Sequence, residues 1–465
     1  MNDIHGHYRP FKGGESTSEI GGLTRAASLI PKIIKENEKE GRTTLVLVAG
    51  DLLTGTPFST AFKGKLGVEL LNKMGFQAMV VGNHEFDYGM ANLLSNVKDP
   101  MTFPLLSDNI VAGDGSKPFK AHLEKKVADF PTNIFIFGLT TVSTLHSTFP
   151  KNVAGLAFED SIKTAQGILK NRKADDLIIA LTHLGVRKDT ELAQACPKID
   201  VVVGGHSHTA IKKPLEVRDS LVVQAGAYAE YLGRLDLDVV NGRVVKHEGR
   251  LIPLDKDVPE DPKIKAIIEQ YASKLDARLD QVIGSTDVFL NGRLSSVRFG
   301  KVTNLAKIIL FSMAKCADAD VAIVNGGSIR SSIPKGEIRL GDVYTVLPFK
   351  NHLVRIKLKG RDLPAILQRN AKLEDGKGGK LLTWGLDVGS IEGELTIQKV
   401  GGKEFDPEKT YVVATNEFLL AGGDGYTVFR EEGKDIFRNP LAISDLLAGF
   451  VREKKTITAE TISGL

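Results

Sequence analysis

Several short motifs in the first half of this 465-residue chain carry side chains of the types that bind metal ions. The opening NDIHGH contains Asp3 and His5, two residues apart, and GGHSHT contains His206 and His208 at the same spacing. Residues two apart in an extended segment point the same way, so each pair could address a single ion. Three further candidates lie between the two pairs: Asp51, Asn83 and His183. Together these residues predict a metal site built from oxygen and nitrogen ligands.

The mixture of carboxylate and imidazole groups indicates which ions such a site would bind and what they would do. It suits zinc, manganese or iron, whereas a set made only of oxygen ligands would indicate magnesium or calcium. Two ions about 3.5 to 4 Å apart can share a bridging carboxylate, activate a water and hold a phosphoryl group for in-line attack. Asp51 follows Gly50 at the end of the apolar run TLVLVAG and is the natural bridge.

The positions of the histidines support a binuclear site. A single histidine is more often structural than a ligand, but five of the ten lie in glycine-rich motifs, and four of these five follow apolar, strand-like runs. These five are His5, His84, His183, His206 and His208. The remaining five are interpreted as structural or surface residues: His7, His122, His146, His247 and His352.

The elements that must position these side chains are strands buried on both faces. The runs TLVLVAGD, AMVVGNHE, DLIIALTHLG and IDVVVGGHSH are apolar throughout rather than alternating, which is typical of strands inside an α/β protein. Catalytic groups of α/β folds cluster at the carboxyl ends of strands, where these motifs lie. The stretch VVQAGAYAEYLGRLDLDVV predicts two more strands, which close a first domain of residues 1–255.

A helix and a second domain are predicted to follow. Asp261 before Pro262 is a helix-start signature, and apolar residues recur at helical spacing as far as Leu279, which indicates a linker helix in residues 256–284. Residues 285–465 alternate strand and helix patterns with glycine-rich turns such as NGGSIR and AGGDGY. A chain of this length usually needs two hydrophobic cores, which agrees with two domains.

Composition excludes several classes of protein. The chain has 61 lysines and arginines against 57 aspartates and glutamates, and no basic block of the kind that follows nucleic acid. Its apolar runs are far shorter than a bilayer span, and no charged-then-apolar signal segment precedes Asp3. Two cysteines, Cys196 and Cys316, are too few for a small disulfide-stapled fold. We therefore expect no nucleic-acid partner and no membrane span.

The motifs NDIHGH, GD, GNHEFD, THLG and GGHSHT, in this order and spacing, resemble those of the calcineurin-like metallophosphoesterases. The resemblance covers nearly the whole chain and is closest to the bacterial family of 5′-nucleotidases, UDP-sugar hydrolases and 2′,3′-cyclic phosphodiesterases. It implies an α/β fold, in which a linker helix joins a four-layer β-sandwich metallophosphoesterase domain to an α/β C-terminal nucleotide-binding domain. It also implies two divalent metal ions, a nucleotide substrate and a monomeric protein.

The resemblance assigns the metal ligands and a catalytic pair. One ion would be held by Asp3, His5, Asp51 and His208, and the other by Asp51, Asn83, His183 and His206. In GNHEFD the family uses a histidine and an aspartate beside the metals, and these are His84 and Asp87 here. Such a histidine can bond a phosphoryl oxygen or protonate the leaving group, while the aspartate fixes its tautomer and favours the imidazolium.

The sequence evidence for substrate contacts in the second domain is weaker. A phenylalanine in a strand usually belongs to the core, and a glycine turn usually only turns the chain. NGGSIR nonetheless offers backbone N–H groups and an arginine to an anion, and two phenylalanines near turns could sandwich a base. By resemblance, the base-stacking rings would be Phe349 and Phe418, the ribose and base contacts Asn351 and Asp424, and the phosphate contacts Arg298, Arg330 and Asn325. One further family arginine has no counterpart, because Leu294 stands at its position and Arg293 is displaced by one residue.

The opening motif differs from the others in what precedes it. Every other ligand motif follows an apolar strand, whereas only Met1 and Asn2 precede Asp3. In the family a buried strand leads into this aspartate. We therefore expect that the coding start lies downstream of the true one, that the first strand is missing, and that an upstream signal segment directs the protein to the periplasm or outside the cell.

Taken together, the motifs and the resemblance predict a metal-dependent phosphoric ester hydrolase that releases phosphate from nucleoside 5′-monophosphates, a 5′-nucleotidase. Three alternatives stay open at this point. The same metals could serve a UDP-sugar hydrolase or a 2′,3′-cyclic-nucleotide phosphodiesterase with 3′-nucleotidase activity. The chain could bind nucleotides without catalysis, although no ligand is missing from its motifs. It could also hydrolyse sulfur esters, which the paired phenylalanines disfavour.

Overall fold

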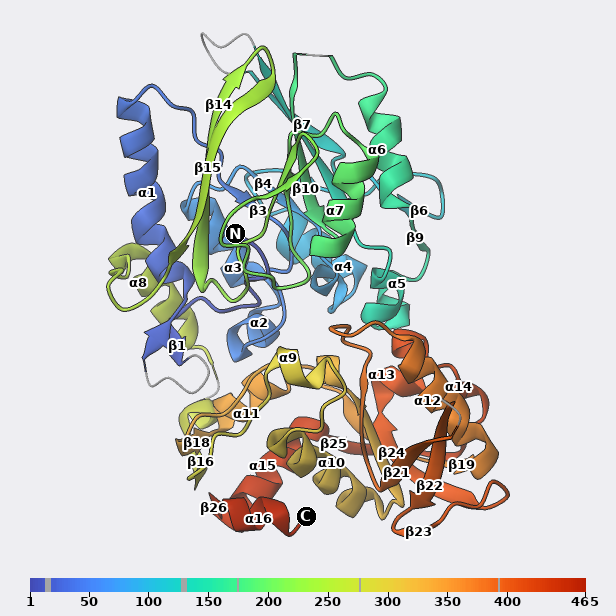
Figure 1. Ribbon diagram of the computed structural model, residues 1–465. Coiled ribbons are helices and arrows are strands. Elements are labelled where there is room, and N and C mark those ends of the chain that lie inside the picture. The colour runs from blue at the N-terminus through green and yellow to red at the C-terminus, as the bar shows by residue number, and fades with distance from the viewer. Residues whose placement is uncertain (13–17, 127–131, 174, 276, 392–393) are drawn as a thin grey trace. The chain divides into compact units, whose positions relative to one another are not determined.

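The computed structural model describes residues 1–12, 18–126, 132–173, 175–275, 277–391 and 394–465, in two compact units. The first unit runs as far as Leu275, and the second contains the described residues from 277 onward. Both units mix helices and strands, as the α/β pattern of the sequence predicted (Figure 1).

Two sheets pack face to face in the first unit. The smaller is parallel and consists of β3 (Leu47–Val48), β4 (Ala78–Val80) and β5 (Leu105–Leu106). The larger has six strands, which in spatial order are β12 (Leu215–Val217), β13 (Ser220–Val223), β11 (Val201–Val203), β10 (Leu177–His183), β8 (Asn133–Thr140) and β7 (His122–Lys126). Apolar side chains of both sheets form one buried cluster between them, which includes Val80, Leu106 and Ile179. The strands predicted to lead into the ligand motifs after the opening one are therefore confirmed.

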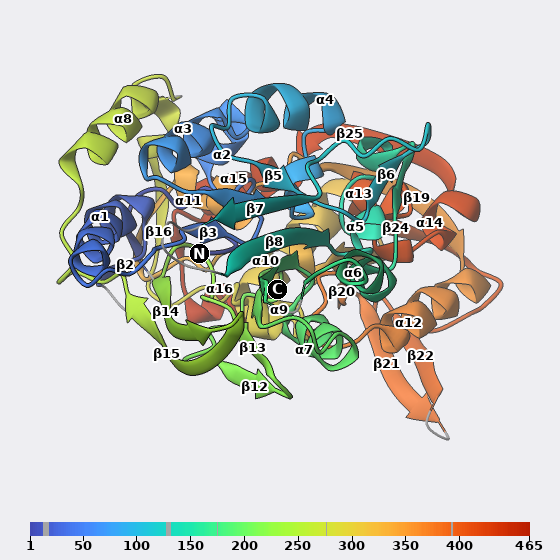
Figure 2. The ribbon, with the colours of Figure 1, turned by 90° about the horizontal axis from the view of Figure 1, so that it is seen from above.

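Helices cover the outer face of each sheet, which gives the four layers expected for the first domain. On the side of the smaller sheet lie α1 (Leu23–Lys39), α3 (Lys65–Lys73) and α8 (Pro262–Ala272), which share a core with β3 and β4. On the side of the larger sheet, α6 (Ser161–Leu169) and α7 (Val186–Ala195) pack against β8, β10 and β13. Figure 2 shows α3 and the pair α6 and α7 on opposite sides of the strands.

A long antiparallel hairpin follows the six-stranded sheet. Its strands, β14 (Tyr231–Val240) and β15 (Arg243–Pro253), meet at Asn241 and Gly242, whose φ angles are both positive, at 50° and 75°. Asn-Gly is the preferred sequence for such a tight turn. The stretch predicted to hold two strands supplies the end of β13 and the whole of β14, while β15 lies beyond it.

Short elements complete the first unit. The strands are β1 (Phe11–Lys12), β2 (Glu19–Ile20), β6 (Ile110–Ala112) and β9 (Leu156–Phe158). The helices are α2 (Pro57–Phe62), α4 (Met90–Asn92) and α5 (Thr144–Ser147). A 3₁₀ turn, η1 (His84–Phe86), carries part of the GNHEFD motif directly after β4.

Helix α8 lies inside the predicted linker, residues 256–284, of which Asp276 is outside the described residues. The side chain of Asp261 accepts hydrogen bonds from the N–H groups of Lys263 and Ile264, both at 2.9 Å, and so caps the helix. The buried isoleucines of α8 belong to the core that α1 and α3 also form. The helix therefore packs as part of the first unit.

The second unit is built around a five-stranded sheet. In spatial order its strands are β20 (Leu381–Trp384), β17 (Val321–Asn325), β24 (Thr410–Asn416), β19 (His352–Lys359) and β25 (Lys434–Ala442). Only β17 and β24 are parallel. Helices α10 (Asn304–Ala317) and α15 (Ile443–Lys454) contact each other and share a buried core with this sheet.

Two smaller sheets and several short helices complete the second unit. The sheets are β18 (Gly336–Arg339), β16 (Val282–Thr286) and β26 (Thr456–Ile457), and β21 (Leu386–Ile391), β22 (Glu394–Val400) and β23 (Lys403–Glu404). The helices are α9 (Leu294–Val297), α11 (Leu340–Val346), α12 (Leu363–Lys372), α13 (Glu417–Leu420), α14 (Val428–Glu431) and α16 (Ala459–Ser463). Within the described ranges of the chain, no helix has both the length and the apolar character needed to cross a membrane.

The cap of α8 yields a prediction about stability. Replacing Asp261 with alanine removes the acceptor of two helix N–H groups and should lower the free energy of unfolding of the first unit by about 1 kcal/mol. Thermal and urea unfolding of the full chain measure this change. Asp257→Ala, four residues earlier in exposed chain, is the matched control and should change stability by less than about 0.5 kcal/mol. Equal stability of the two variants would contradict the capping role.

Candidate functional site

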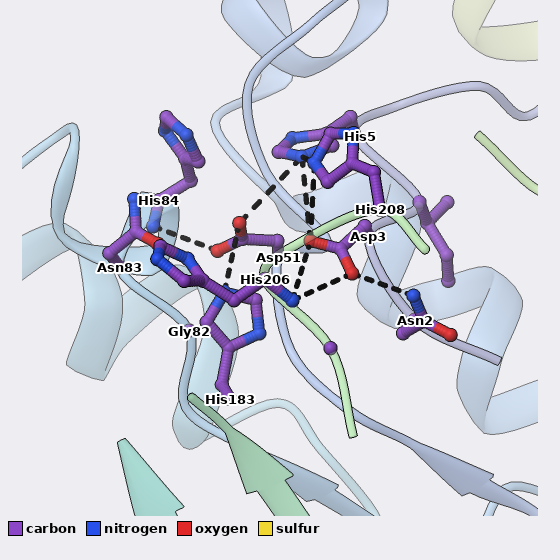
Figure 3. Close-up of polar contacts among 12 residues, drawn as sticks. Asn2, Asp3, His5, Asp51, Gly82, Asn83, His84, His183, His206 and His208 are labelled. Atoms are coloured by element: carbon purple, nitrogen blue, oxygen red, sulfur yellow. Dashed lines mark hydrogen bonds and ion pairs between the residues drawn. The ribbon is translucent and has the colours of Figure 1, made fainter. Parts of the chain in front are cut away.

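The predicted metal ligands occupy sharp turns that follow strands or extended segments. Five of them have a positive φ between 49° and 77°: Asp3, His5, Asp51, His206 and His208. Residues other than glycine rarely adopt this backbone, and its cost in free energy is typically found at functional sites. The turns direct these side chains toward one another, as Figure 3 shows.

Asp3, His5 and His208 form a first group, in which one ligand atom from each residue lies within 4.8 Å of the others. Nε2 of His208 is 3.3 Å from Oδ1 of Asp3 and 3.2 Å from Nε2 of His5. Nδ1 of His5 lies 2.7 Å from the carbonyl oxygen of Thr54, which can only accept, so this nitrogen carries the hydrogen. The other nitrogen of His5 is then the one suited to a metal ion.

A second group consists of Asp51, His183 and His206, again with one ligand atom from each residue within 4.8 Å of the others. Nε2 of His183 is 3.0 Å from Oδ2 of Asp51, and its Nδ1 is 2.7 Å from the carbonyl oxygen of Ala49. The amide oxygen of Asn83 lies 2.9 Å from Nδ1 of His206. The structure therefore brings together the four residues that the resemblance assigns to a second ion.

The Asp51 carboxylate connects the two groups. Its Oδ2 lies 3.7 Å from Nε2 of His5 as well as 3.0 Å from Nε2 of His183. Its Oδ1 accepts a hydrogen bond from the backbone N–H of His84 at 2.9 Å. Asp51 is only 1% exposed, so water hardly competes for these contacts. This is the position expected of a bridging ligand.

The charges in this cluster favour a divalent cation. Burial by itself would raise the pKa of Asp51, but the neighbouring histidines, led by His183, hold the pKa well below its usual value. Burial would likewise lower the pKa of His183, yet the Asp51 carboxylate raises it to about 10. The buried carboxylate thus attracts positive charge, which a zinc or manganese ion would supply to the same nitrogen and oxygen atoms. The residues present fit such ions.

His84 and Asp87 form the pair expected from GNHEFD. Nδ1 of His84 lies 2.6 Å from Oδ2 of Asp87, and the hydroxyl of Thr148 donates to Oδ1 of Asp87 at 3.1 Å. The ring of His84 is also 5.0 Å from that of His5, centroid to centroid. The pair therefore lies beside the ligand cluster and is held in place by a third side chain.

Glu85 is a functional residue that the sequence reasoning missed. It is fully buried, and its carboxylate accepts four backbone hydrogen bonds of 2.6 to 3.3 Å, from Asp51, Leu52, Leu53 and Gly82. One side chain therefore ties the turn after β3 to the turn after β4. Burial and the charge of Asp51 raise the pKa of Glu85 to about 7. Its place inside the GNHEFD motif was the one available signal.

Tyr228 is a second residue that was missed. It has a φ of 58°, and its N–H donates to the carbonyl oxygen of Asp3 at 2.7 Å. Its ring centroid lies 5.7 Å from that of His5 and 5.4 Å from that of His208. His7 packs on the same ring at 4.4 Å and belongs to none of the ligand groups found among the described residues. Tyr228 thus forms an aromatic wall beside the first group, and no spacing in the sequence signalled it.

The residues expected to contact substrate gather at one edge of the five-stranded sheet. β24 runs parallel to β17 and antiparallel to β19, with Leu353 opposite Asn416. The segments after β17, after β24 and before β19 therefore meet at one edge. They contain Asn325, Arg330, Phe349, Asn351, Phe418 and Asp424. Arg298 lies close enough for its charge to lower the pKa of Asp424.

Asp424 belongs to a partly buried polar network at this edge. Its φ is 52°, and its Oδ2 accepts from Nδ2 of Asn325 at 3.2 Å. Burial is the main influence on the pKa of Asp424 and raises it to about 7. Two residues that were not predicted complete the network: Arg369 donates to the carbonyl oxygen of Asp424 at 2.9 Å, and Asn416 donates to the side-chain oxygen of Asn325 at 3.1 Å. Residue type alone carried no signal for either.

Comparison with known proteins shows which families and structures this chain is similar to. Residues 1–210 match the family model of the calcineurin-like phosphoesterases, and residues 282–431 match that of the 5′-nucleotidase C-terminal domain. The chain is 31% identical to protein UshA of Yersinia enterocolitica over 480 residues, which are 91% of this chain and 85% of that protein. It is 32% identical over 94% of its length to the trifunctional nucleotide phosphoesterase protein YfkN of Bacillus subtilis, but spans only 32% of that protein. A crystal structure of a 5′-nucleotidase precursor from Thermus thermophilus is 28% identical, with a TM-score of 0.87 and coverage of 98% of this chain and 96% of that one.

The contacts of Glu85 yield a prediction about the assembly of the site. Glu85→Gln keeps the size of the side chain but turns N–H donors toward buried N–H groups, so we expect the free energy of unfolding to fall by about 2 to 4 kcal/mol. Metal affinity should fall roughly 10- to 100-fold, because the turn that carries Asp51 loses its support. Urea unfolding and metal analysis after dialysis measure the two effects. Glu38→Gln, on the exposed side of α1, is the control and should change neither quantity.

Proposed function

Because this chain belongs to the calcineurin-like phosphoesterases that carry a 5′-nucleotidase C-terminal domain, we propose that it releases phosphate from nucleoside 5′-monophosphates. Its enzyme class is that of the metal-dependent phosphoric ester hydrolases. The observation that carries the proposal is the presence of two complementary sites in one chain. The first unit holds the ligand cluster around Asp51, and the second holds the polar edge around Asp424.

The two ligand groups support four ligands for each of two divalent ions, zinc, manganese or a similar metal. The proposed sets are Asp3, His5, Asp51 and His208, and Asp51, Asn83, His183 and His206. Ions held there supply Lewis-acid charge that acidifies a water and neutralises phosphoryl oxygens. The carbonyl contacts of His5 and His183 fix the ring nitrogen that each one presents.

Departure of the nucleoside requires a proton, and His84 is the proposed donor. When water attacks phosphorus, the bond to O5′ breaks and O5′ takes a proton, which yields the nucleoside and inorganic phosphate. Asp87 accepts from Nδ1 of His84 at 2.6 Å, which orients the ring and leaves Nε2 as the nitrogen that gives up its proton.

The edge of the second unit supports recognition of a nucleotide. Phe418 is held in place by Gly423, where a Cβ would lie 2.5 Å from the ring, and we propose that Phe418 and the half-buried Phe349 stack on the base. Each stacking contact with a base contributes roughly 1 to 3 kcal/mol. The proposed polar contacts are Asn351 and Asp424 for the ribose and base, and Arg298, Arg330 and Asn325 for the phosphate. Leu294 stands where the family has a further arginine, so the number of phosphates that the site prefers is decided by the substrate panel below.

A second candidate is the hydrolysis of UDP-sugars or 2′,3′-cyclic nucleotides at the same cluster. The similarity to a protein named a trifunctional nucleotide phosphoesterase favours it. A ligand cluster of this kind acts on the phosphoryl group, which all these substrates share, so the choice among them depends on the contacts of the second unit.

The compartment and the assembly belong to the same proposal. From the resemblance to bacterial 5′-nucleotidases we infer that the protein works in the periplasm or outside the cell, as a monomer. Fractionation of cells that carry the gene with its native upstream region locates the protein, and light scattering gives its mass in solution.

A substrate panel tests the proposed activity. The chain loaded with Mn²⁺ should release phosphate from AMP with a kcat/KM at least about tenfold above that for UDP-glucose or 2′,3′-cyclic AMP. Chelation should abolish the activity, and Mn²⁺ should restore it. Hydrolysis of the other substrates without any of AMP would favour the second candidate. Nucleotide binding with less than one metal ion per chain and no hydrolysis would favour a binding protein.

The role of His84 gives a sharper prediction. His84→Ala should lower kcat on AMP by roughly 100- to 10,000-fold, because the leaving oxygen loses its proton donor. The loss should be much smaller on p-nitrophenyl phosphate, whose leaving group departs without a proton, and the metal content should stay unchanged. His122→Ala, on the exposed side of β7, is the control and should keep full activity. Equal losses on the two substrates would show that His84 does not act as the acid.

A further inference from the structure

Two of the proposed metal ligands lie in one turn, which has a support outside the ligand set. His206 and His208 belong to the segment from Gly204 to Thr209, which directly follows β11. Both histidines have a positive φ, of 77° and 57°. Residues other than glycine keep such backbone only where the surrounding contacts hold it in place. The turn therefore needs partners that fix its course.

The side chain of Gln224 makes three hydrogen bonds to this turn. Its Nε2 donates to the carbonyl oxygen of Gly205 at 2.9 Å. Its Oε1 accepts from the hydroxyl of Ser207 at 2.9 Å and from the backbone N–H of Thr209 at 2.6 Å. Gln224 is only 3% exposed, so water hardly competes for these bonds. One amide group thus holds the turn before, between and after its two histidines.

The six-stranded sheet explains why Gln224 can reach the turn. Gln224 directly follows β13, which lies beside β11 in the sheet. The two strands are parallel, with Val203 opposite Val223, and the N–H of Gly204 donates to the carbonyl oxygen of Val223 at 2.9 Å. Both segments therefore leave the sheet at the same edge, and Gln224 lies next to the start of the turn.

The first two residues of the turn are packed tightly against other parts of the first unit. A Cβ atom at Gly204 would collide with the carboxyl group of Asp189, and one at Gly205 would collide with the carbonyl oxygen of Ala49. Glycine at both positions permits these close approaches. Together with the three bonds of Gln224, they restrict the positions that the turn can take.

We propose that Gln224 is a positioning residue for both metal ions, which holds His206 for one ion and His208 for the other. The two histidines belong to different ligand groups, so a shift of this turn alters both groups at once. Oε1 of Gln224 already accepts two hydrogen bonds, so Gln224 acts through the turn and is not a further ligand. The inference rests on the two ligand sets of the proposed function. Glu85 has a different role, because it supports the turn that carries the shared Asp51.

Titration of the full chain with Mn²⁺, with the free ion followed by electron paramagnetic resonance, tests this role. Gln224→Met keeps the length of the side chain but removes its three bonds, so the affinity for both ions should fall roughly 10- to 100-fold. The matched control is Val222→Ala, two residues earlier in the buried part of β13. It should lower the unfolding temperature by several degrees but change the affinity for either ion by less than about twofold. The titrations are run at a temperature at which circular dichroism shows every variant to be folded.

A milder variant keeps the test decisive if Gln224→Met does not fold. Ser207→Ala changes an exposed residue and removes one of the three bonds of Gln224, so it should lower the affinity for both ions by about two- to tenfold.

Several outcomes would overturn the inference. Gln224→Met, or Ser207→Ala in its place, could bind both ions as tightly as the unaltered chain, or lose affinity for one ion only. Val222→Ala could lose as much affinity as Gln224→Met, or the unaltered chain could bind fewer than two ions. The titration involves no nucleotide, so its result is separate from that of the substrate panel. A chain that binds two ions without hydrolysing AMP would contradict the proposed activity and leave the role of Gln224 to be decided by the variants.

Discussion

The site depends on one shared carboxylate in a place that water hardly reaches. Oδ1 of Asp51 is held by the backbone N–H of His84, while Oδ2 faces the imidazoles of His5 and His183. A buried carboxylate without partners would cost several kcal/mol, so the surrounding groups must stay in position. Glu85 holds these groups in position, because its carboxylate accepts hydrogen bonds from the backbone N–H groups of Asp51 and Gly82. The position of this carboxylate between the two ligand groups therefore depends on the turns that Glu85 holds.

The same structural device recurs in the second unit. Asp424, like Asp51, is an aspartate in left-handed backbone beside the carboxyl ends of parallel strands, with other side chains fixing its position. The two sites differ in what surrounds the carboxyl group. Imidazoles surround Asp51 and suit it to metal ions, whereas amide and guanidinium groups surround Asp424 and suit it to the polar groups of a small molecule. In the proposed function, reaction chemistry and substrate choice are thereby divided between the two units.

The parts of the fold and site that depend on residue types and their spacing along the chain could be predicted from the sequence. The strands that end at Asp51 and His183, the capping of α8 by Asp261 and the clustering of the histidines could all be read from it. Glu85, Tyr228 and Arg369 could not, because each acts on the backbone of residues far away in the chain. Hairpin strand β15 was missed because the apolar pattern on which the prediction relied ended at β14.

The contact between Asp3 and His206 has a consequence for how the protein reaches its active form. Oδ2 of Asp3 accepts the N–H of His206 at 2.9 Å across a separation of 203 residues, and this bond links the first ligand group to the second. Closing so long a loop has a high entropic cost and comes late in folding, after local helices and hairpins have formed. The full set of ligands is therefore assembled only when these distant parts of the chain have come together. A metal ion that binds only this assembled set would stabilise the folded chain relative to the unfolded one.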